Sequence, residues 1–507
     1  MEQKEELRGS YILDALHDVD MHGDAYASVD ELYQLCQREQ RDLSKDVFLA
    51  DKTFLTGKNK LAQEGRRIYL KRMLGYENAA ARALADILSA NDLRTAGSFS
   101  PTNLPSGTAG LTDEQCAAID MALSYRLSLI LGGAGTGKAT LVQALASRYD
   151  GPLPGIVLCA PTGKAARNLT QRTGFPARTV HGALGLRPDE DFLGPVSWPH
   201  TGLVVVDEAS MLSLEMLTGI HNVVSRLAPV VLVGDPNQLL SVGAGNVLPD
   251  LLALGFPCSR LTICHRQSAD AEALLQNVLQ FHDCRSARDL HFDNSFYFVP
   301  QLDESLIRRT VCIGAAKFYR AGASVQVLSP FREAGKLSVA GLNRNIRELV
   351  NPTTEVNRNP DFPGAFFCEG DRVMVTKNDW NQDVCNGDIG QFCFWSNSSS
   401  EAYGIRCADG RRAVWYGKSP KAMLELAYAI TVHRAQGSEY DMVILPLTKR
   451  FSTMLTRNLL YTAISRAKRH VVLVGDPDAL ELALQREPRP KKSMLVTKTR
   501  MFQVKAA

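Results

Sequence analysis

The feature that most constrains the fold is a glycine-rich loop, GGAGTGKAT, at Gly132–Thr140, which follows directly on the apolar run LSLIL. Glycines at this spacing let the backbone curl, so that its N–H groups converge on phosphate oxygens at the N-terminus of the next helix. Lys138 then neutralises the β- and γ-phosphates. A strand, a phosphate-binding loop and a helix in this order predict an α/β fold that binds a nucleoside triphosphate.

One position of the loop departs from the usual pattern. The residue after the lysine is normally Ser or Thr, whose hydroxyl ligates Mg²⁺, and here it is Ala139. Thr140 is rotated by about 100° around the helix, so it is a poor substitute. A water can take the ligand position, because Mg²⁺ readily keeps several waters. The sequence predicts secure phosphate binding with a weaker hold on Mg²⁺ and weakened hydrolysis.

The second half of the predicted nucleotide site is the segment LVVVDEASM at Leu203–Met211. Its apolar residues form a buried strand that delivers Asp207 and Glu208 to the strand end. Asp207 can hold Mg²⁺ through water, and Glu208 can orient or deprotonate the attacking water. Together with the glycine-rich loop, this segment predicts ATP hydrolysis.

Bulk properties set the class of protein. The chain has 507 residues, a net charge of +3 and a hydrophobic content of 45%, which indicate a folded protein of several domains. No apolar run approaches the roughly 20 residues that span a bilayer, and the N-terminus MEQKEELRGS lacks the apolar region of a signal peptide. The 11 cysteines form no CxxC pair or Cys/His cluster, which favours reduced thiols in a cytoplasmic protein.

The chain divides into regions that differ in their pattern of apolar, charged and turn-forming residues. Helical periodicity and the basic stretch RRIYLKR at Arg66–Arg72 predict an N-terminal winged-helix-like domain, with the stretch forming a hairpin. Buried-strand runs such as VVLVGDP and MVILPL predict two α/β lobes, and alternating strands with turn signals predict a β-barrel insertion in the second lobe. The expected boundaries are 1–95 for the N-terminal domain, 96–110 for a linker, 111–270 for lobe 1, 271–350 and 421–485 for lobe 2, 351–420 for the insertion and 486–507 for a basic tail.

The tail is the clearest local concentration of charge. Against the single acidic residue Glu487 it carries seven basic residues, namely Arg486, Arg489, Lys491, Lys492, Lys498, Arg500 and Lys505. Such runs are more often solvated than bound to nucleic acid, and we expect a solvated tail.

A series of motifs after the phosphate loop resembles one family. VVVDEASML, VGDPNQL, LTICHRQS, AYAITVHRAQGSEYD and LLYTAISRAKRHVVLVGD follow one another in this order. The series resembles superfamily 1 helicases, and most closely the RecD family of the 5′→3′ branch. The resemblance runs from about Leu111 to Leu484. It implies two RecA-like P-loop lobes, a small SH3-like β-barrel insertion and an N-terminal helical, winged-helix-like domain, with ATP and Mg²⁺ held between the lobes.

The resemblance assigns roles in the nucleotide site. Gln115 corresponds to a glutamine that reads adenine, and Gln238 to a sensor that links the γ-phosphate to the DNA strand. Arg266 and Arg466 correspond to arginines that reach the γ-phosphate from each lobe, where a guanidinium stabilises transition-state charge. Glu439 corresponds to a residue near the ribose and phosphates. The implied nucleotide contacts from the loop are Gly133, Gly135, Thr136, Gly137, Lys138, Ala139 and Thr140.

The resemblance also implies a channel for single-stranded DNA. Hydroxyls and backbone amides can hold phosphates without reading sequence, and histidines can stack on bases. The corresponding residues are Pro161, Thr162, Gly163, Thr179, His181, Thr431 and His433. Residues 186–202 occupy the place of the family's strand-splitting hairpin, and the segment is short, so translocation is better supported than duplex separation.

We therefore expect an ATP-dependent helicase or translocase that acts on single-stranded DNA and single-strand/duplex junctions in repair or recombination. Three alternatives remain open. The chain can be the ATP-binding subunit of a helicase–nuclease complex, a hydrolysis-impaired regulatory ATPase because of Ala139, or an RNA helicase of the Upf type. No membrane partner is expected.

Overall fold

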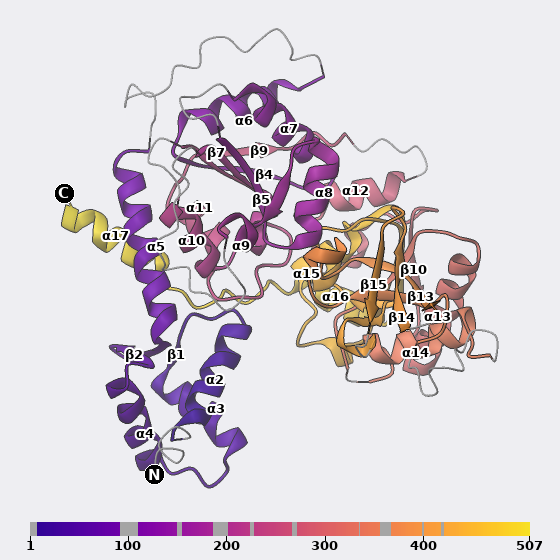
Figure 1. The fold of residues 1–507 in the computed structure, drawn as a ribbon, viewed down its shortest axis with the longest axis horizontal. Helices are drawn as coiled ribbons and strands as arrows, with labels where there is room; N and C mark the ends of the chain where they lie inside the picture. Colours follow the sequence, from indigo (N-terminus) through magenta and orange to yellow (C-terminus); the bar gives the residue numbers. More distant parts are fainter. Residues whose placement is uncertain are drawn as a thin grey trace.

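The fold consists of two α/β lobes, an N-terminal module and a β-sheet insertion (Figure 1). The computed structural model describes residues 8–91, 110–149, 155–185, 201–223, 228–265, 271–333, 335–354, 367–397, 400–416 and 420–506. Both lobes are built on parallel sheets, so the predicted α/β class is confirmed. Among these residues, no helix has the length and apolar character needed to cross a membrane.

Lobe 1 contains a six-stranded parallel sheet in the order β6-β5-β7-β8-β4-β9. Its central strands are entirely buried, which explains their unbroken apolar sequences. The strands are β4 (Leu127–Gly132), β5 (Gly155–Ala160), β6 (Ala177–Thr179), β7 (Thr201–Val206), β8 (Val230–Gly234) and β9 (Cys258–Leu261), and the helices are α6 (Asp113–Ser124), α7 (Lys138–Arg148), α8 (Gly163–Thr173), α9 (Val180–Ala183), α10 (Leu214–Val223) and α11 (Val247–Ala253). The ends of β4, β7 and β8 lie at one edge, where the predicted nucleotide residues follow them.

Lobe 2 contains a five-stranded parallel sheet in the order β10-β19-β18-β11-β17. Its strands are β10 (Phe296–Pro300), β11 (Val325–Ser329), β17 (Ala429–Thr431), β18 (Tyr440–Leu447) and β19 (Ala467–Gly475), and its helices are α12 (Glu272–Gln280), α13 (Glu304–Arg320), α14 (Val339–Val350), α15 (Arg457–Ile464) and α16 (Pro477–Gln485). Helix α15 faces lobe 1, and it carries several of the contacts between the lobes that are described below.

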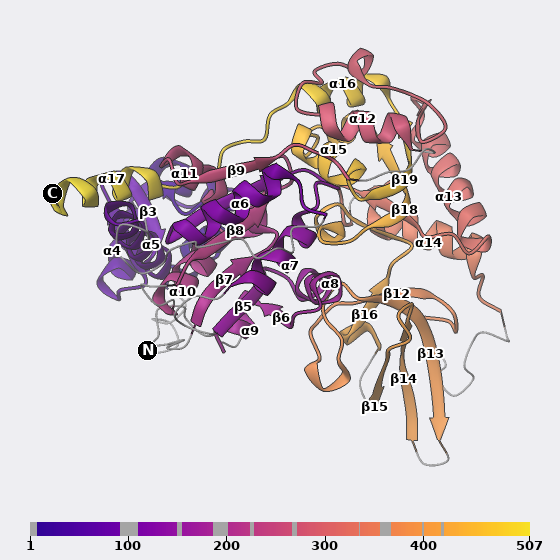
Figure 2. The same cartoon turned by 90° about the horizontal axis from the view of Figure 1, so that it is seen from above.

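The insertion is a five-stranded antiparallel sheet that projects from lobe 2 (Figure 2). Its strands are β12 (Arg372–Val375), β13 (Ile389–Asn397), β14 (Ser400–Cys407), β15 (Arg412–Tyr416) and β16 (Leu424–Leu426). Aromatic side chains such as Phe392, Tyr403 and Trp415 fill its own small core. Strand β16 pairs with β12, so the sheet runs a few residues past Pro420, where the sequence placed its end.

The N-terminal module consists of helices and a three-stranded sheet. Helices α2 (Ser10–Met21), α3 (Val29–Glu39) and α4 (Lys45–Gly57) precede a hairpin of β2 (Leu61–Glu64) and β3 (Arg67–Leu70), and the short β1 (Ala27–Ser28) pairs with β3. A hairpin is therefore present, but RRIYLKR supplies only its second strand, and Lys71 already begins the next helix. The hairpin turn uses Gly65 at φ 60°, a conformation that favours glycine.

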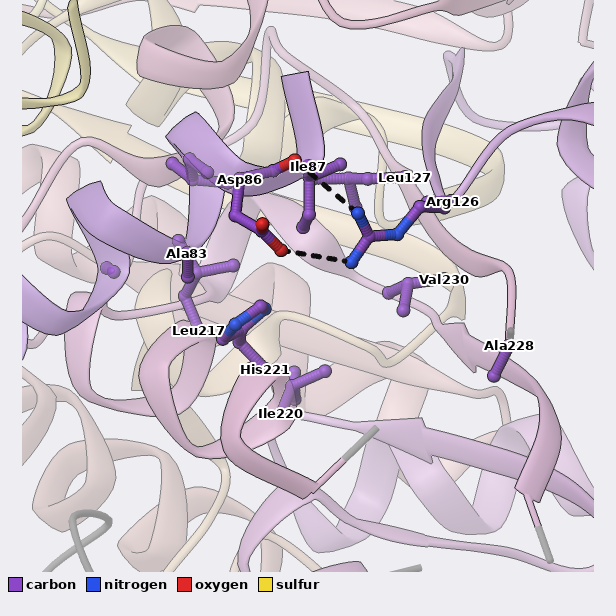
Figure 3. Close-up of a pocket in the computed structure, with 12 residues that line it drawn as sticks. Ala83, Asp86, Ile87, Arg126, Leu127, Leu217, Ile220, His221, Ala228 and Val230 are labelled. Atoms are coloured by element: carbon purple, nitrogen blue, oxygen red, sulfur yellow. Dashed lines mark hydrogen bonds and ion pairs between the residues drawn. The ribbon is translucent and has the colours of Figure 1, made fainter. Parts of the chain in front are cut away.

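Helix α5 (Lys71–Ser89) connects the N-terminal module to lobe 1, and the two share one apolar core. A mainly apolar cavity of about 170 Å³ lies between α5 and α10 (Figure 3). Arg126 closes one side of the cavity by pairing with the Asp86 carboxylate at 3.4 Å. The module is thus packed onto lobe 1 rather than tethered to it.

The basic tail differs from the sequence expectation of a solvated run. Its last helix, α17 (Leu495–Ala506), lies against α5, as Figure 1 shows in yellow beside indigo. Lys498 is buried and pairs with Glu77 at 3.0 Å and Glu64 at 2.8 Å, and Arg489 pairs with Asp24 at 2.6 Å. The prediction holds for the exposed Arg486 and Arg500 but is wrong for Lys498, because its acidic partners lie more than 400 residues earlier in the chain.

Candidate active site

A cavity of about 640 Å³ lies between the two lobes. Lobe 1 contributes the phosphate loop, one face of α8 and the residues that follow β7 and β8, while lobe 2 contributes the segments around Glu439 and Arg466. Of the predicted nucleotide residues, those lining the cavity are Gly135, Thr136, Gly137, Lys138, Ala139, Thr140, Asp207, Glu208, Gln238, Glu439 and Arg466. The fold brings them together from both lobes.

The phosphate loop has the expected geometry. Gly135 and Gly137 have φ values of 82° and 78°, which a side chain at either position would disfavour. Gly137 caps the N-terminus of α7, so the free N–H groups of that helix face the cavity. The Lys138 ammonium donates to the carbonyl oxygens of Gly132 and Gly133 at 2.6 and 2.7 Å. The loop thus holds a positive charge over converging amides, which suits a triphosphate.

Asp207 and Glu208 lie at the end of β7, opposite the loop. Burial raises the pKa of Asp207 to about 6, the neighbouring Glu208 adds to the effect, and Lys138 opposes it. Glu208 adopts φ 54° and ψ 42°, a left-handed conformation that costs a non-glycine residue about 1–3 kcal/mol. The following turn, Ala209–Met211, is well packed and maintains this strained conformation beside the cavity.

Lobe 2 grips the loop that carries Gln238. The Asn458 amide donates to the Gln238 carbonyl at 2.9 Å, the Thr462 hydroxyl accepts from the Leu239 amide at 2.8 Å, and the Tyr461 hydroxyl donates to the Asp235 carboxylate at 2.8 Å. All three side chains come from α15. The same helix supplies the Thr462 carbonyl, which accepts from Arg466 at 3.2 Å. Helix α15 therefore positions both the loop that carries Gln238 and the Arg466 side chain.

Three predicted nucleotide residues are not found in the cavity lining. Gly133 of the loop instead accepts a hydrogen bond from Lys138 through its carbonyl oxygen. Gln115 is buried behind the phosphate loop, where its side chain caps α6 through Thr112 and approaches the Thr136 carbonyl at 3.5 Å. It does not line the cavity, and its role in reading adenine stays a prediction. Arg266 lies outside the described residues.

The sequence did not lead to the prediction of several residues that line the cavity. Ala165, Asn168, Leu169 and Arg172 line the cavity from one face of α8, with the spacing of successive helical turns. That periodicity was the signal available in the sequence. Arg172 pairs with Glu439 of lobe 2 at 2.8 Å, so an ion pair crosses between the lobes at the cavity. Lys468 and Arg469 add positive charge from lobe 2.

A second cavity, of about 530 Å³, contains most of the predicted strand-contacting residues, and we call it the strand channel. Its lining includes Pro161, Thr162, Gly163, Thr179, His181 and His433. Thr431 is not part of this lining, and its hydroxyl instead accepts from the Arg434 amide at 3.3 Å. Burial lowers the pKa of His181 and His433, and Lys491 lowers that of His433 further. A lowered pKa favours the neutral form of each ring, which suits stacking on bases.

The insertion forms one wall of the strand channel, which the sequence analysis missed. Asn378, Trp380, Asn386 and Gly387 line the cavity from this side. Trp380 is 63% exposed in the structure. The signal available in the sequence was a tryptophan within the polar segment KNDWNQD. An aromatic face at this place can stack on a base.

An arginine of α8 joins lobe 1 to the insertion, and we call this contact the clasp. Arg167 pairs with Asp388 and with Asp383, the latter at 3.0 Å, and Arg411 also pairs with Asp388 at 3.1 Å. Burial alone would raise the pKa of Asp388, but Arg411, the Cys385 amide and Arg167 hold it below its usual value. Nearby, Lys164 donates to the Gly387 carbonyl at 3.2 Å. The clasp lies beside the channel, because Lys164 and Gly387 line the cavity whereas Arg167 and Asp388 do not. Of the predicted strand-splitting segment, 186–202, the structure describes residues 201 and 202, and these belong to β7.

Comparisons with known proteins agree with this architecture. Sequence profiles match an AAA domain at residues 110–296, the SH3 domain of ATP-dependent RecD-like DNA helicases at 342–402, and a UvrD-like helicase C-terminal domain at 426–474. The RecD subunit of the RecBCD enzyme from Mycolicibacterium smegmatis is 31% identical over 422 residues, covering 74% of this chain and 73% of that protein. The chain belongs to the RecD family of superfamily 1 helicases.

Other RecD-family and related proteins are similar as well. The ATP-dependent RecD2 DNA helicase of Deinococcus radiodurans is 33% identical over 441 residues, or 86% of this chain. The match spans 59% of that protein's length. Among solved structures, the Pif1 helicase of Candida albicans aligns with a TM-score of 0.46 at 17% identity, covering 78% of this chain and 99% of the other.

Proposed function

We propose that the chain is an ATP-driven motor that moves along single-stranded DNA, as the family and the two cavities together suggest. The observation that carries the proposal is the loop between β8 and α11. Gln238 on this loop lines the nucleotide cavity and Val242, four residues later, lines the strand channel. A shift of the loop in response to nucleotide therefore also moves Val242 in the wall of the strand channel.

Helix α8 provides a second connection. Its N-terminal end, with Gly163 and Lys164, lines the strand channel, and Arg172 near its C-terminal end lines the nucleotide cavity. Between them, Asn168 donates to the Gly437 carbonyl of lobe 2. Opening or closing of the lobes moves this helix and the strand together, which is the basis for ratcheting.

In the proposed mechanism, Lys138 and the loop amides hold the β- and γ-phosphates, and Arg466 stabilises the charge that develops during transfer to water. Glu208 orients that water. Asp207 supplies a carboxylate at the cavity wall that is suited to Mg²⁺, whereas Ala139 offers no hydroxyl. The site therefore fits the ion with one protein ligand fewer than usual. Bound Mg²⁺ would neutralise charge on the two phosphates.

The test is ATP hydrolysis with and without single-stranded DNA or RNA of matched length. The proposal expects strong stimulation by DNA. Nucleotide binding without hydrolysis under any condition would favour the hydrolysis-impaired alternative, and stimulation by RNA alone would favour an RNA helicase. Forked duplexes with a 5′ or a 3′ tail then test the 5′→3′ polarity that the family resemblance implies.

A second candidate function rests on the relatives named as subunits of the RecBCD enzyme. The chain can act as the ATP-binding motor subunit of a larger helicase–nuclease or repair complex. Size-exclusion chromatography with multi-angle scattering of the endogenous protein distinguishes a single chain from a complex.

A further inference from the structure

The tail segment before α17 spans the molecule. After α16 in lobe 2, residues 486–494 run as an extended segment to the N-terminal module, visible as the yellow strand of chain in Figures 1 and 2. Both ends of the segment are fixed. The Arg486 carbonyl accepts from the Arg457 amide of α15 at 2.9 Å, and Leu495 is fully buried in the core shared by the module and lobe 1.

In the middle of this segment, Lys491 reaches the loop that carries Gln238 and Val242, which we call the sensor loop. The ammonium donates to the Ser241 hydroxyl at 2.8 Å, to the Gly243 carbonyl at 3.0 Å and to the Ser241 carbonyl. Its path runs against Gly23, where an added Cβ would lie 2.4 Å from the lysine Cε. Only glycine leaves room for this approach.

The environment makes these three bonds important to the lysine. Burial lowers the pKa of Lys491 to about 8, with Asp24 and Asp20 acting in the opposite direction. The Asp24 carboxylate is already engaged by Arg489 and by the Lys492 amide. His433 of lobe 2 lies near the lysine, and burial and the lysine charge both lower the pKa of its ring. The ammonium is half-buried and forms no ion pair with any of the residues that the structure describes. It therefore depends on well-placed oxygens, so its position and that of the loop determine each other.

The three bonds act on the part of the loop between the two cavities. Ser241 and Gly243 flank Val242, which is 49% exposed and lines the strand channel. The Gly245 amide donates to the Gly23 carbonyl at 3.0 Å, and the Leu239 amide donates to Thr462. The loop is thus held by lobe 2 at one end, by the N-terminal module at the other, and by Lys491 between them.

We propose that Lys491 is a positioning residue that holds the sensor loop, so that occupancy of the strand channel at Val242 is transmitted to Gln238 in the nucleotide cavity. This inference rests on the proposed motor function. It assigns a role to the C-terminal segment 486–494, none of whose residues lines the nucleotide cavity or the strand channel.

The test compares Lys491→Met with Lys492→Met in the full chain. Methionine preserves the length of the lysine and removes the charge. Lys492 is the matched control, because it lies in the same segment but pairs with Glu31 at 2.5 Å rather than with the loop. Two measurements are made on each variant, namely hydrogen–deuterium exchange of residues 238–246 and the ratio of DNA-stimulated to DNA-free ATP hydrolysis.

We expect Lys491→Met to speed exchange in the sensor loop and to lower the stimulation ratio by about 3- to 10-fold, while Lys492→Met matches the parent. Unchanged loop exchange in Lys491→Met refutes the inference whether or not the parent hydrolyses ATP. Faster exchange with an unchanged ratio, or equal effects of the two substitutions, also refutes it. A parent that shows no stimulation by DNA contradicts the motor proposal instead, and loop exchange still decides whether Lys491 holds the loop.

Discussion

The clasp between α8 and the insertion provides the sharpest test of the proposed strand channel. Arg167 lies one turn after the channel-lining Lys164 in α8, and it connects lobe 1 to Asp388 and Asp383 of the insertion. Its side chain is 17% exposed and that of Asp388 is 6% exposed, so solvent screens this pair weakly. Replacing Arg167 with methionine removes the charge and keeps most of the apolar stem.

The size of the effect follows from what remains after the change. The Asp383 carboxylate is 75% exposed, so that pair contributes little. Arg411 and the Cys385 amide still bind Asp388, which is therefore not left as an orphaned buried charge. The loss is then that of one charge-assisted hydrogen bond, about 1.5–3 kcal/mol. At about 1.4 kcal/mol per tenfold, this corresponds to strand release that is about 10- to 150-fold faster.

The assay is stopped-flow release of a fluorescent single-stranded oligonucleotide into excess unlabelled competitor. Arg260→Met serves as the control, because Arg260 is exposed on β9, at the sheet edge opposite β6, and carries the same charge. Release from Arg260→Met should match the parent at equal salt. If Arg167→Met releases the strand within twofold of the parent while remaining folded, the clasp does not retain the strand and the reasoning fails.

Three further predictions concern the two cavities. Ala139→Thr restores a hydroxyl ligand, so the Mg²⁺ concentration for half-maximal ATP hydrolysis should fall by about tenfold, and no change in a Mg²⁺ titration would show that water fully replaces the ligand. Trp380→Ala should weaken single-strand binding by about 1–3 kcal/mol in fluorescence anisotropy, whereas Tyr416→Ala, at 58% exposure outside the channel lining, should leave it unchanged. Asp207 has a pKa of about 6 and takes up a proton below it, so the half-saturating Mg²⁺ concentration should rise by about tenfold per pH unit as pH falls below 6; a flat profile from pH 7 to 5 would contradict this.

Local sequence was sufficient for the residues at strand ends. The glycine-rich loop and the Asp207–Glu208 pair each follow a buried strand directly, and parallel strands present their carboxyl ends at one edge of the sheet. The chemistry of the nucleotide site could therefore be predicted without knowing how the lobes pack. The missing hydroxyl at Ala139 was visible in the same way.

The arrangement around the strand depended on tertiary structure. Trp380 enters the channel only because the insertion folds back toward lobe 1, and Arg167 meets Asp388 across 221 residues of sequence. No local pattern encodes such a pairing, because its energy depends on burial and on partners that the folded chain supplies.

The basic tail separates the two levels most clearly. By itself the sequence determined its charge, and a charged run is by default solvated. Only the fold placed Glu77, Asp24 and the carbonyls of the sensor loop where they neutralise and direct that charge. The sequence thus determined which groups can carry out the chemistry. The tertiary structure decided which of these groups interact, because a long-range contact is favourable only once both partners are already buried together.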